Sequence, residues 1–175
     1  MLPYVTIIGG GLAGCETAYQ IAKAGIPVKL YEMKPKKYSP AHSNENLAEI
    51  VCSNSFKSNL HTNACGLLKE ELLLLNSLLI RIANEVKVPA GQALAVDREI
   101  FSKRVTEEIK NMENIEIINE EVTKIPEEGI TVIATGPLTS DKLSEEISKL
   151  TGSNKLAFYD AAAPIIEKNS IDMNI

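Results

Sequence analysis

The sequence predicts an α/β protein with a mostly parallel sheet of the Rossmann type and a small β excursion. Two observations near the N-terminus favour this fold: glycines at GxGxxG spacing follow an apolar run, and an acidic residue ends the next apolar run. The third observation is the alternation of strand-like and helix-like segments along most of the 175 residues. Such alternation is typical of parallel sheets, because parallel strands need a crossover connection that is usually a helix.

The glycine turn is the run Gly9-Gly10-Gly11-Leu12-Ala13-Gly14, between a predicted strand at residues 4–8 and a predicted helix at residues 12–24. In this context Gly9 allows a sharp turn, Gly11 lets the backbone approach a pyrophosphate, and Gly14 lets the helix lie close to the strand. The free N–H groups and the positive dipole end of the helix favour an anion. We therefore predict dinucleotide binding; the alternative is that the glycines only make a tight turn.

The second predicted strand, residues 27–32, ends in Glu32. Glu32 lies 18 residues after Gly14, which is close to the spacing of about 20 at which a carboxylate accepts from the ribose of a dinucleotide. Residues 33–44 contain two prolines and three lysines and are predicted to be a loop. Its lysines are expected either to be solvated or to screen the phosphates of the ligand.

Composition excludes several classes of protein. The net charge of −5 argues against a dedicated nucleic-acid-binding module. No apolar run is long enough to span a bilayer, and the N-terminus lacks the pattern of a signal peptide. The three cysteines, Cys15, Cys52 and Cys65, lack CxxC spacing, so we expect neither a disulfide framework nor a metal site. The predicted location is the reducing cytoplasm.

The middle of the chain is unusual for a connection. Residues 46–50 are predicted to form a short helical turn, and residues 51–66 are dense in hydroxyl and amide side chains that can line a polar site. Residues 67–86 are predicted to form one long leucine-rich helix. Its apolar stripe is so broad that we expect burial on more than one side.

The C-terminal half returns to alternating helices and strands. Asp97 is predicted to cap a helix at residues 98–110, and Thr139 and Ser140 are predicted to cap a helix at residues 141–150. The first of these helices is predicted to bury Ile100, Phe101, Val105 and Ile109. The predicted strands are residues 92–96, residues 115–118, an antiparallel partner at residues 122–125, a buried strand at residues 130–136 and a last strand at residues 156–159. Thr135-Gly136 closes the buried strand at the carboxyl edge of the sheet, where ligands bind.

These segments resemble the flavin-binding half of the two-dinucleotide-domain flavoproteins, in which a GxGxxG turn, an acid after the second strand and an Ala-Thr-Gly strand end surround FAD. A closer resemblance is to the folate- and FAD-dependent tRNA (uracil-5-)-methyltransferase family, TrmFO, formerly called Gid. The motifs that carry it lie in family order along essentially the whole chain: Gly9-Gly10-Gly11-Leu12-Ala13-Gly14, Tyr31-Glu32-Met33-Lys34-Pro35, Pro40-Ala41-His42, Val51-Cys52-Ser53-Asn54-Ser55, Thr62-Asn63-Ala64-Cys65-Gly66-Leu67-Leu68-Lys69-Glu70-Glu71, Pro89-Ala90-Gly91-Gln92-Ala93-Leu94-Ala95-Val96-Asp97-Arg98, Ala134-Thr135-Gly136-Pro137-Leu138-Thr139-Ser140 and Phe158-Tyr159-Asp160-Ala161-Ala162-Ala163-Pro164.

The resemblance implies an activity and its ligands. The full-length enzyme would form 5-methyluridine in the T-loop of tRNA, with 5,10-methylenetetrahydrofolate as the carbon donor and FAD with NAD(P)H as the reductant. This chain would supply the FAD-binding half of a truncated two-dinucleotide-domain flavoprotein. The implied cofactor-binding residues are Gly9, Gly10, Gly11, Leu12, Ala13, Gly14, Glu32, Met33, Lys34, Val122, Thr135 and Gly136.

Cys52, in the run Val51-Cys52-Ser53-Asn54-Ser55, matches the cysteine that the family has next to the flavin. C5 of uracil is a poor nucleophile, and a thiolate that adds at C6 would activate it. The resemblance therefore implies that Cys52 is the active-site thiol; the alternative is a buried structural cysteine. Cys15 and Cys65 are predicted to be packing residues, and His42 is predicted to lie in a loop or near the flavin.

The sequence departs from the family pattern in two respects. Family members are much longer, so the chain resembles an N-terminal fragment that we expect to be inactive alone. Lys34 stands where the family pattern has arginine, which keeps the charge but not a bidentate donor. Within the fragment, residues 1–34 and 92–175 are predicted to form the dinucleotide core, and residues 35–91 a helical and loop insertion.

Two other functions stay open. One is the FAD-binding module of the related flavoprotein family that modifies the wobble uridine of tRNA, which shares the glycine turn and a cysteine loop. The other is a non-catalytic module that only binds a dinucleotide. An NAD(P)H-dependent disulfide reductase is disfavoured, because it needs a redox cysteine pair that the sequence lacks.

Overall fold

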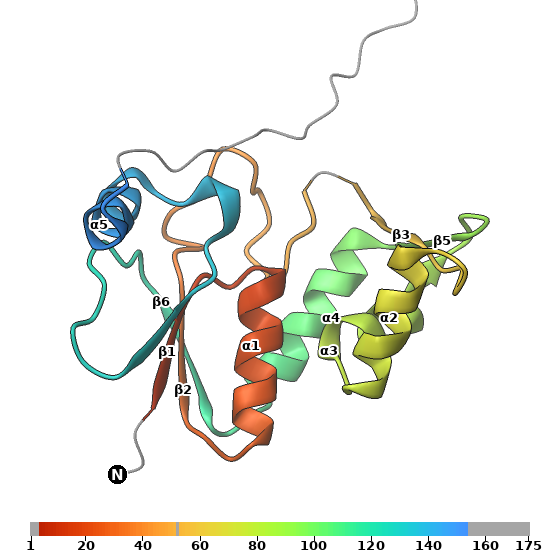
Figure 1. The fold of residues 1–175 in the computed structure, drawn as a ribbon, viewed down its shortest axis with the longest axis horizontal. Helices are drawn as coiled ribbons and strands as arrows, with labels where there is room; N and C mark the ends of the chain where they lie inside the picture. The colour runs from red at the N-terminus through yellow and green to blue at the C-terminus, as the bar shows by residue number, and fades with distance from the viewer. Residues whose placement is uncertain (1–3, 52, 154–175) are drawn as a thin grey trace, which may run out of the picture.

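The computed structural model describes residues 4–51 and 53–153, which form a parallel sheet with packed helices beside a smaller antiparallel unit (Figure 1). In chain order the elements are β1 (Val5–Ile8), α1 (Leu12–Lys23), β2 (Val28–Glu32), β3 (Ser55–Ser58), α2 (Ala64–Leu74), α3 (Leu78–Glu85), β4 (Lys87–Val88), β5 (Ala93–Val96), α4 (Arg98–Lys110), β6 (Ile115–Asn119), β7 (Ile130–Ile133) and α5 (Asp141–Thr151). A short 3₁₀ helix, Gly136–Leu138, precedes α5.

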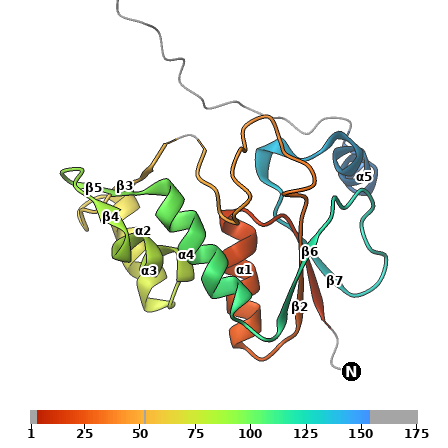
Figure 2. The same cartoon turned by 180° about the vertical axis from the view of Figure 1, so that it is seen from behind.

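The main sheet has four parallel strands in the order β6-β2-β1-β7. Val5 of β1 pairs with Val28 of β2 on one side and with Ile130 of β7 on the other. The chain steps from β1 to β2 to β6 in one direction, so right-handed crossovers place α1 and α4 on the same face of the sheet (Figure 2). Helix α1 packs against β1 and β2, and α4 packs against α1 and β6.

A smaller antiparallel sheet, in the order β3-β5-β4, lies beside α4 (Figure 2). Ser55 of β3 pairs with Ala95 of β5, and Lys57, with φ of 63°, lies where the register of the pair becomes irregular. Helices α2 and α3 pack against this sheet. The rings of Phe56 and Phe101 lie 5.4 Å apart, which joins the small sheet to α4.

One hydrophobic core connects both sheets. Its largest fully buried side chains come from the strands β1, β2 and β5 and from the helices α3 and α4: Ile7, Leu30, Leu78, Ile82, Leu94, Phe101 and Ile109. Within the described part of the chain, no helix is both long enough and apolar enough to cross a membrane.

The predicted α/β class with a mostly parallel sheet is confirmed. Asp97 caps α4, because its carboxylate accepts two backbone N–H groups of the first turn at 3.0 Å. Helix α1 ends at Lys23, close to the predicted end, and is followed by Gly25, which has φ of 80°. There the N–H of Ile26 donates to the carbonyl of Ile21 at 3.3 Å, in the hydrogen-bond pattern of a Schellman motif.

The prediction of one helix over residues 67–86 is wrong. Asn76 takes the left-handed conformation, with φ of 59°, and the hydroxyl of Ser77 accepts the N–H of Ile80 at 3.2 Å. Ser77 is therefore the N-cap of a new helix, α3. The expected broad burial holds for α3 but not at the end of α2, where Leu74 is 83% exposed.

Three further strand predictions concern residues 122–125, 130–136 and 156–159. Residues 122–125 do not form a strand; β6 pairs in parallel with β2 instead, and the chain continues from β6 as a loop. Strand β7 was expected to be buried, but it is an edge of the described sheet, and Ile130 is 68% exposed. The predicted strand at residues 156–159 lies outside the described residues.

The predicted helical turn at residues 46–50 is replaced by bends. The N–H of Ala48 donates to the carbonyl of Gly10 at 2.8 Å, and Leu47 donates its N–H to the hydroxyl of Thr106 at 2.9 Å. These contacts with distant parts of the chain take the place of helical hydrogen bonds.

Two details of the later helices also differ. Ile100 is 50% exposed, so the predicted apolar face of α4 is narrower than expected. Ser140 stands at the N-cap of α5 without a side-chain hydrogen bond to that helix, and the hydroxyl of Thr139 donates to the carbonyl of Gly136 at 2.8 Å. The predicted capping by these two hydroxyls is therefore wrong.

Candidate functional site

A cavity of about 320 Å³ lies at the carboxyl ends of β1, β2 and β7, the edge of the sheet at which ligands bind in such folds. Its walls are the glycine turn, the loop after β2, residues 120–122 after β6 and the segment after β7. All of the predicted cofactor-binding residues except Gly14 line it: Gly9, Gly10, Gly11, Leu12, Ala13, Glu32, Met33, Lys34, Val122, Thr135 and Gly136.

The glycines of the turn have two different roles. Gly9 has φ of 104°, and a Cβ added there would lie 2.6 Å from the carbonyl oxygen of Ala134. A Cβ added to Gly14 would lie 1.8 Å from the carbonyl oxygen of Gly9, so Gly14 sets the contact of α1 with the turn from behind the cavity. A Cβ added to Gly11 would meet no atom within 4 Å. Gly9 and Gly14 therefore serve packing, whereas Gly11 leaves space in the cavity.

Helix α1 begins at this cavity. Gly11 is its N-cap residue, and Leu12 and Ala13 of its first turn line the cavity. Gly11 offers no side-chain cap, and the first turn contains no acidic residue. The N–H groups that a helix start leaves unpaired, together with the positive end of the helix dipole, therefore remain for an anion.

Glu32 is held in place by the backbone on both sides of it. Its Oε2 accepts the N–H of Gly10 at 2.8 Å, and its Oε1 accepts the N–H of Lys34 at 3.0 Å. The residue is only 8% exposed and lines the cavity. Each oxygen of a carboxylate can accept more than one hydrogen bond, so Glu32 can also accept from a ligand hydroxyl.

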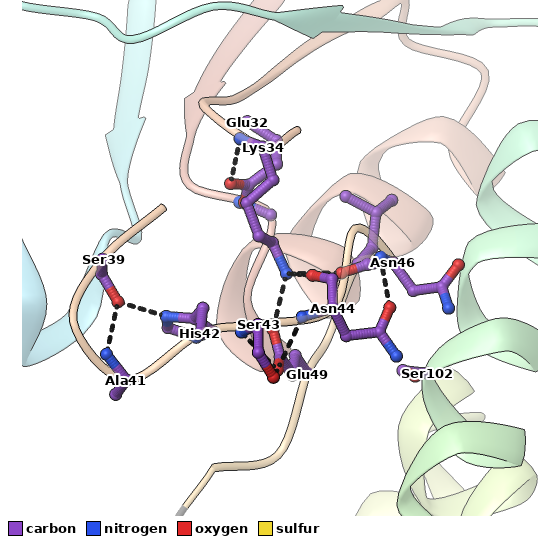
Figure 3. A network of polar contacts seen from close by, with 12 residues as sticks. Glu32, Lys34, Ser39, Ala41, His42, Ser43, Asn44, Asn46, Glu49 and Ser102 are labelled. Carbon is purple, nitrogen blue, oxygen red and sulfur yellow. Dashed lines mark hydrogen bonds and ion pairs between the residues drawn. The ribbon is translucent and has the colours of Figure 1, made fainter. Parts of the chain in front are cut away.

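The side chain of Lys34 runs into the loop after β2, as Figure 3 shows. Its ammonium donates to the carbonyls of Asn44 at 2.9 Å and Asn46 at 2.6 Å, and to Oε2 of Glu49 at 3.1 Å. Three contacts use all three hydrogens of an ammonium group. The side chain of Lys34 therefore holds the loop together, and its backbone N–H donates to Glu32.

Glu49 is the centre of this loop. Its Oε1 accepts the N–H groups of Ser43 at 3.0 Å and Asn44 at 3.1 Å. Partial burial raises the pKa of the Glu49 carboxyl, but the Ser43 hydrogen bond and the contact with Lys34 outweigh burial and hold that pKa below its ordinary value. Glu49 is thus ionised at neutral pH and fixes the wall of the cavity.

Two further contacts join this loop to the end of β6 and the segment that follows. The ammonium of Lys37 and the carboxylate of Glu121 form an ion pair of 2.7 Å, and the amide of Asn119 donates to the carbonyl of Lys34 at 2.6 Å. Val122 follows directly and lines the cavity. The ammonium of Lys37 is therefore already paired with a carboxylate of the protein.

The two described cysteines differ in environment. Cys15 is fully buried, its Sγ donates to the carbonyl of Gly10 at 3.3 Å, and burial raises the pKa of its thiol to about 12. The prediction that Cys15 is a packing residue is confirmed. Cys65 is half-buried in the first turn of α2. Cys52 lies outside the described residues; its neighbour Val51 lines the cavity.

Ser39 and Glu49 line the cavity and were missed by sequence reasoning. They lie in an aperiodic loop, and no spacing rule links them to Lys34 or to the glycine turn. His42, which was expected near the ligand, does line the cavity. Its Nδ1 lies 2.5 Å from the hydroxyl oxygen of Ser39 (Figure 3).

Comparison with known proteins relates the chain to one family. The sequence profile of the family described as glucose inhibited division protein A matches residues 4–175. A methylenetetrahydrofolate–tRNA-(uracil-5-)-methyltransferase TrmFO from Acetivibrio thermocellus is 62% identical over 99% of this chain and 40% of its own length. The TrmFO of Ligilactobacillus salivarius is 60% identical over 99% of this chain and 40% of its own length. The chain therefore spans about 40% of the length of these curated relatives.

Solved structures support the fold. GidA of Aquifex aeolicus, in two crystal forms, aligns with a TM-score of 0.57 at 18% identity over 73% and 74% of this chain and 21% of the solved chain. At this identity the likeness concerns the fold alone, and it agrees with the predicted Rossmann-like α/β class. The profile match over residues 4–175, together with relatives of about 60% identity, shows that this chain belongs to the glucose inhibited division protein A (GidA) family.

Proposed function

We propose that this chain binds FAD in the cavity described above. The observation that carries the proposal is the hydrogen bond of 2.8 Å from the N–H of Gly10 to the carboxylate of Glu32, because a carboxylate next to the glycine turn is suited to accept from a ribose hydroxyl. The start of α1 and the open space at Gly11 suit the pyrophosphate. The residues present therefore fit a dinucleotide.

The remaining predicted cofactor residues contribute from the other walls. Met33 and Lys34 contribute mainly through the backbone next to Glu32, and Val122 contributes from the loop after β6. Thr135 and Gly136 contribute from the segment after β7, where the hydroxyls of Thr135 and Thr139 lie 2.6 Å apart. Gly14 supports the turn from behind. We propose residues 1–34 and 92–175 as the dinucleotide core and residues 35–91 as an insertion.

We infer that the full-length protein is a methylenetetrahydrofolate–tRNA-(uracil-5-)-methyltransferase, because relatives with that name are 57% to 62% identical to this chain. Its proposed substrates are methylenetetrahydrofolate and a uridine in the T-loop of tRNA. A methylene group must gain two electrons to become a methyl group, so the reaction needs a reductant. NAD(P)H is the proposed source, and bound FAD would supply the two-electron redox chemistry.

Cys52 is the proposed nucleophile of this half. Its thiolate would add to C6 of the uracil, and the negative charge that forms would make C5 able to attack the methylene carbon. The bond between that carbon and its carrier nitrogen would break, and two electrons from the reductant would complete the methyl group. Loss of the C5 proton and departure of the thiolate would restore the ring. The position of Cys52 next to Val51, a residue of the cavity wall, supports this role.

The sequence identities of the relatives favour this function over the alternatives. The TrmFO relatives are 57% to 62% identical, whereas GidA of Aquifex aeolicus is 18% identical and supports only the fold.

For the isolated chain we propose dinucleotide binding without methyl transfer, since it spans about 40% of the relatives' length. The cytoplasm is the proposed compartment, because the tRNA substrate and reduced thiols occur there.

A methylation assay with the full-length protein tests the function. Unmodified tRNA is incubated with methylenetetrahydrofolate, NAD(P)H and FAD, and the position of the methylated uridine is mapped. We expect 5-methyluridine in the T-loop only when both folate and reductant are present, and none from the isolated chain. Methyl transfer from S-adenosylmethionine, or modification at the wobble uridine, would overturn the assignment.

A further inference from the structure

We propose that His42 is a further ligand-binding residue of the cavity, whose Nε2–H donates a hydrogen bond to a phosphate oxygen of the bound dinucleotide. The proposal rests on the dinucleotide site proposed above and adds a side-chain donor to the backbone donors at the start of α1. Its basis is the position of His42, its contact with Ser39, and the charges around the cavity.

A tight turn presents His42 to the cavity. The N–H of His42 donates to the carbonyl of Ser39 at 3.2 Å, which closes the turn over residues 39–42. Ser39 is 8% exposed, although Tyr38 and Pro40 on either side of it are exposed. The turn is thus anchored at Ser39, and both Ser39 and His42 line the cavity (Figure 3).

The hydroxyl of Ser39 lies against Nδ1 of His42. Its Oγ accepts the N–H of Ala41 at 3.3 Å and lies 2.5 Å from Nδ1 of His42. In the proposed arrangement the hydroxyl hydrogen of Ser39 is donated to Nδ1. A neutral imidazole that accepts at Nδ1 carries its proton on Nε2. No described residue forms a hydrogen bond with Nε2 of His42, so this donor is available to a ligand.

The charges around the cavity favour such a donor. The charged side chains in its lining, apart from His42, are four carboxylates and one ammonium: Glu32, Glu49, Glu120, Glu121 and Lys34. Lys34 uses its three donors on Asn44, Asn46 and Glu49. A pyrophosphate adds further negative charge. On the wall formed by the loop after β2, His42 therefore adds a side-chain donor whose Nε2 is not bound to another described residue.

Binding of ADP and adenosine to the full-length protein freed of cofactor tests the proposal, because the two probes differ in their phosphates. The variant His42→Leu is expected to bind ADP about tenfold more weakly than the wild type and to bind adenosine equally well. His42→Gln, which keeps an amide N–H near the position of Nε2, is expected to recover most of the ADP affinity. FAD affinity should follow the ADP series.

His61→Leu is the matched control, because His61 is an exposed histidine on the segment before α2, where it pairs with Glu70 at 3.1 Å. It should bind ADP as the wild type does, and circular dichroism checks the fold of each variant. Unchanged ADP affinity in His42→Leu, or equal losses of ADP and adenosine, would overturn the assignment of His42 to phosphate. A wild type that binds neither ADP nor FAD would instead overturn the dinucleotide site itself.

Discussion

The carboxylate of Glu32 accepts the backbone N–H of Gly10 across a distance of 2.8 Å, which ties the end of β2 to the glycine turn after β1. The same carboxylate accepts the N–H of Lys34 at 3.0 Å. The acid predicted to bind the ribose is therefore already fixed beside the turn predicted to bind the pyrophosphate. A ligand that meets both groups finds them preorganised, which reduces the entropy lost on binding.

Replacement of Glu32 by alanine is expected to affect both stability and binding. It leaves two buried backbone N–H groups without their acceptor, so the free energy of unfolding should fall by about 2 kcal/mol in a urea titration. It also removes the ribose acceptor, so the affinity for FAD, measured by flavin fluorescence, should fall at least about tenfold. Glu128→Gln, in an exposed turn, is the control. Wild-type FAD affinity in Glu32→Ala would remove Glu32 from the ligand site.

Gly14 and Gly11 give opposite predictions for the same substitution. An alanine at Gly14 places Cβ 1.8 Å from the carbonyl oxygen of Gly9, so α1 must shift, and the free energy of unfolding should fall by about 1–3 kcal/mol. An alanine at Gly11 meets no atom within 4 Å and should change stability by less than about 0.5 kcal/mol. Urea unfolding of both variants measures the difference. Equal stabilities would show that α1 does not pack on the turn as described.

Glu49 makes stability depend on acid pH. Partial burial raises the pKa of its carboxyl, but the hydrogen bond from Ser43 and the contact with Lys34 prevail, so the pKa is lower in the folded chain than in the unfolded one. Such a group stabilises the folded state above its unfolded pKa, and this contribution is lost as the pH falls through its folded pKa.

The free energy of unfolding of the wild type should therefore fall more steeply between about pH 5 and pH 3 than that of Glu49→Gln, which cannot titrate there. Urea titrations at several pH values measure the two slopes. Glu45→Gln, a change at an exposed glutamate of the same loop, should keep the wild-type slope. Parallel curves for the wild type and Glu49→Gln would contradict the described network.

Cys52 and Cys65 allow a matched test of the proposed thiol. In the full-length protein, Cys52→Ala should abolish methyl transfer to tRNA and leave FAD bound, because the thiolate acts on the uracil and not on cofactor binding. Cys65→Ala should retain both, since Cys65 is half-buried in the first turn of α2, and its predicted role is packing. The methylation assay and the flavin absorbance of each variant measure the outcome. Full activity of Cys52→Ala would exclude its thiol as the nucleophile.

The elements around the glycine turn could be predicted because their signals are local. A β-branched run precedes Gly9, small residues follow in α1, and Glu32 lies at the expected spacing. The break between α2 and α3 could not be predicted as readily, because leucines on both sides conceal the short signal of Asn76 and Ser77. The left-handed Asn76 and the N-cap Ser77 end one helix and begin the next, although the apolar pattern of the leucines continues across them.

The wall formed by the loop after β2 could not be predicted. The lysines of this loop are predicted to be solvated or to screen the phosphates of a ligand, yet Lys34 is 4% exposed, because three acceptors in residues 44–49 surround its ammonium. Such a network depends on how an aperiodic loop folds back, and no spacing rule encodes that. Val122 shows a similar limit: it lines the cavity as predicted, although the strand predicted around it does not form.

The open space at Gly11 offers the most direct test of the central claim, which is that this cavity holds the pyrophosphate of FAD. The measurement is the dissociation constant of FAD for the full-length wild type and for Gly11→Val, together with urea unfolding of both proteins without cofactor. We predict an affinity lower by at least about 100-fold, with the free energy of unfolding changed by less than about 1 kcal/mol. Wild-type FAD affinity in Gly11→Val would contradict the claim.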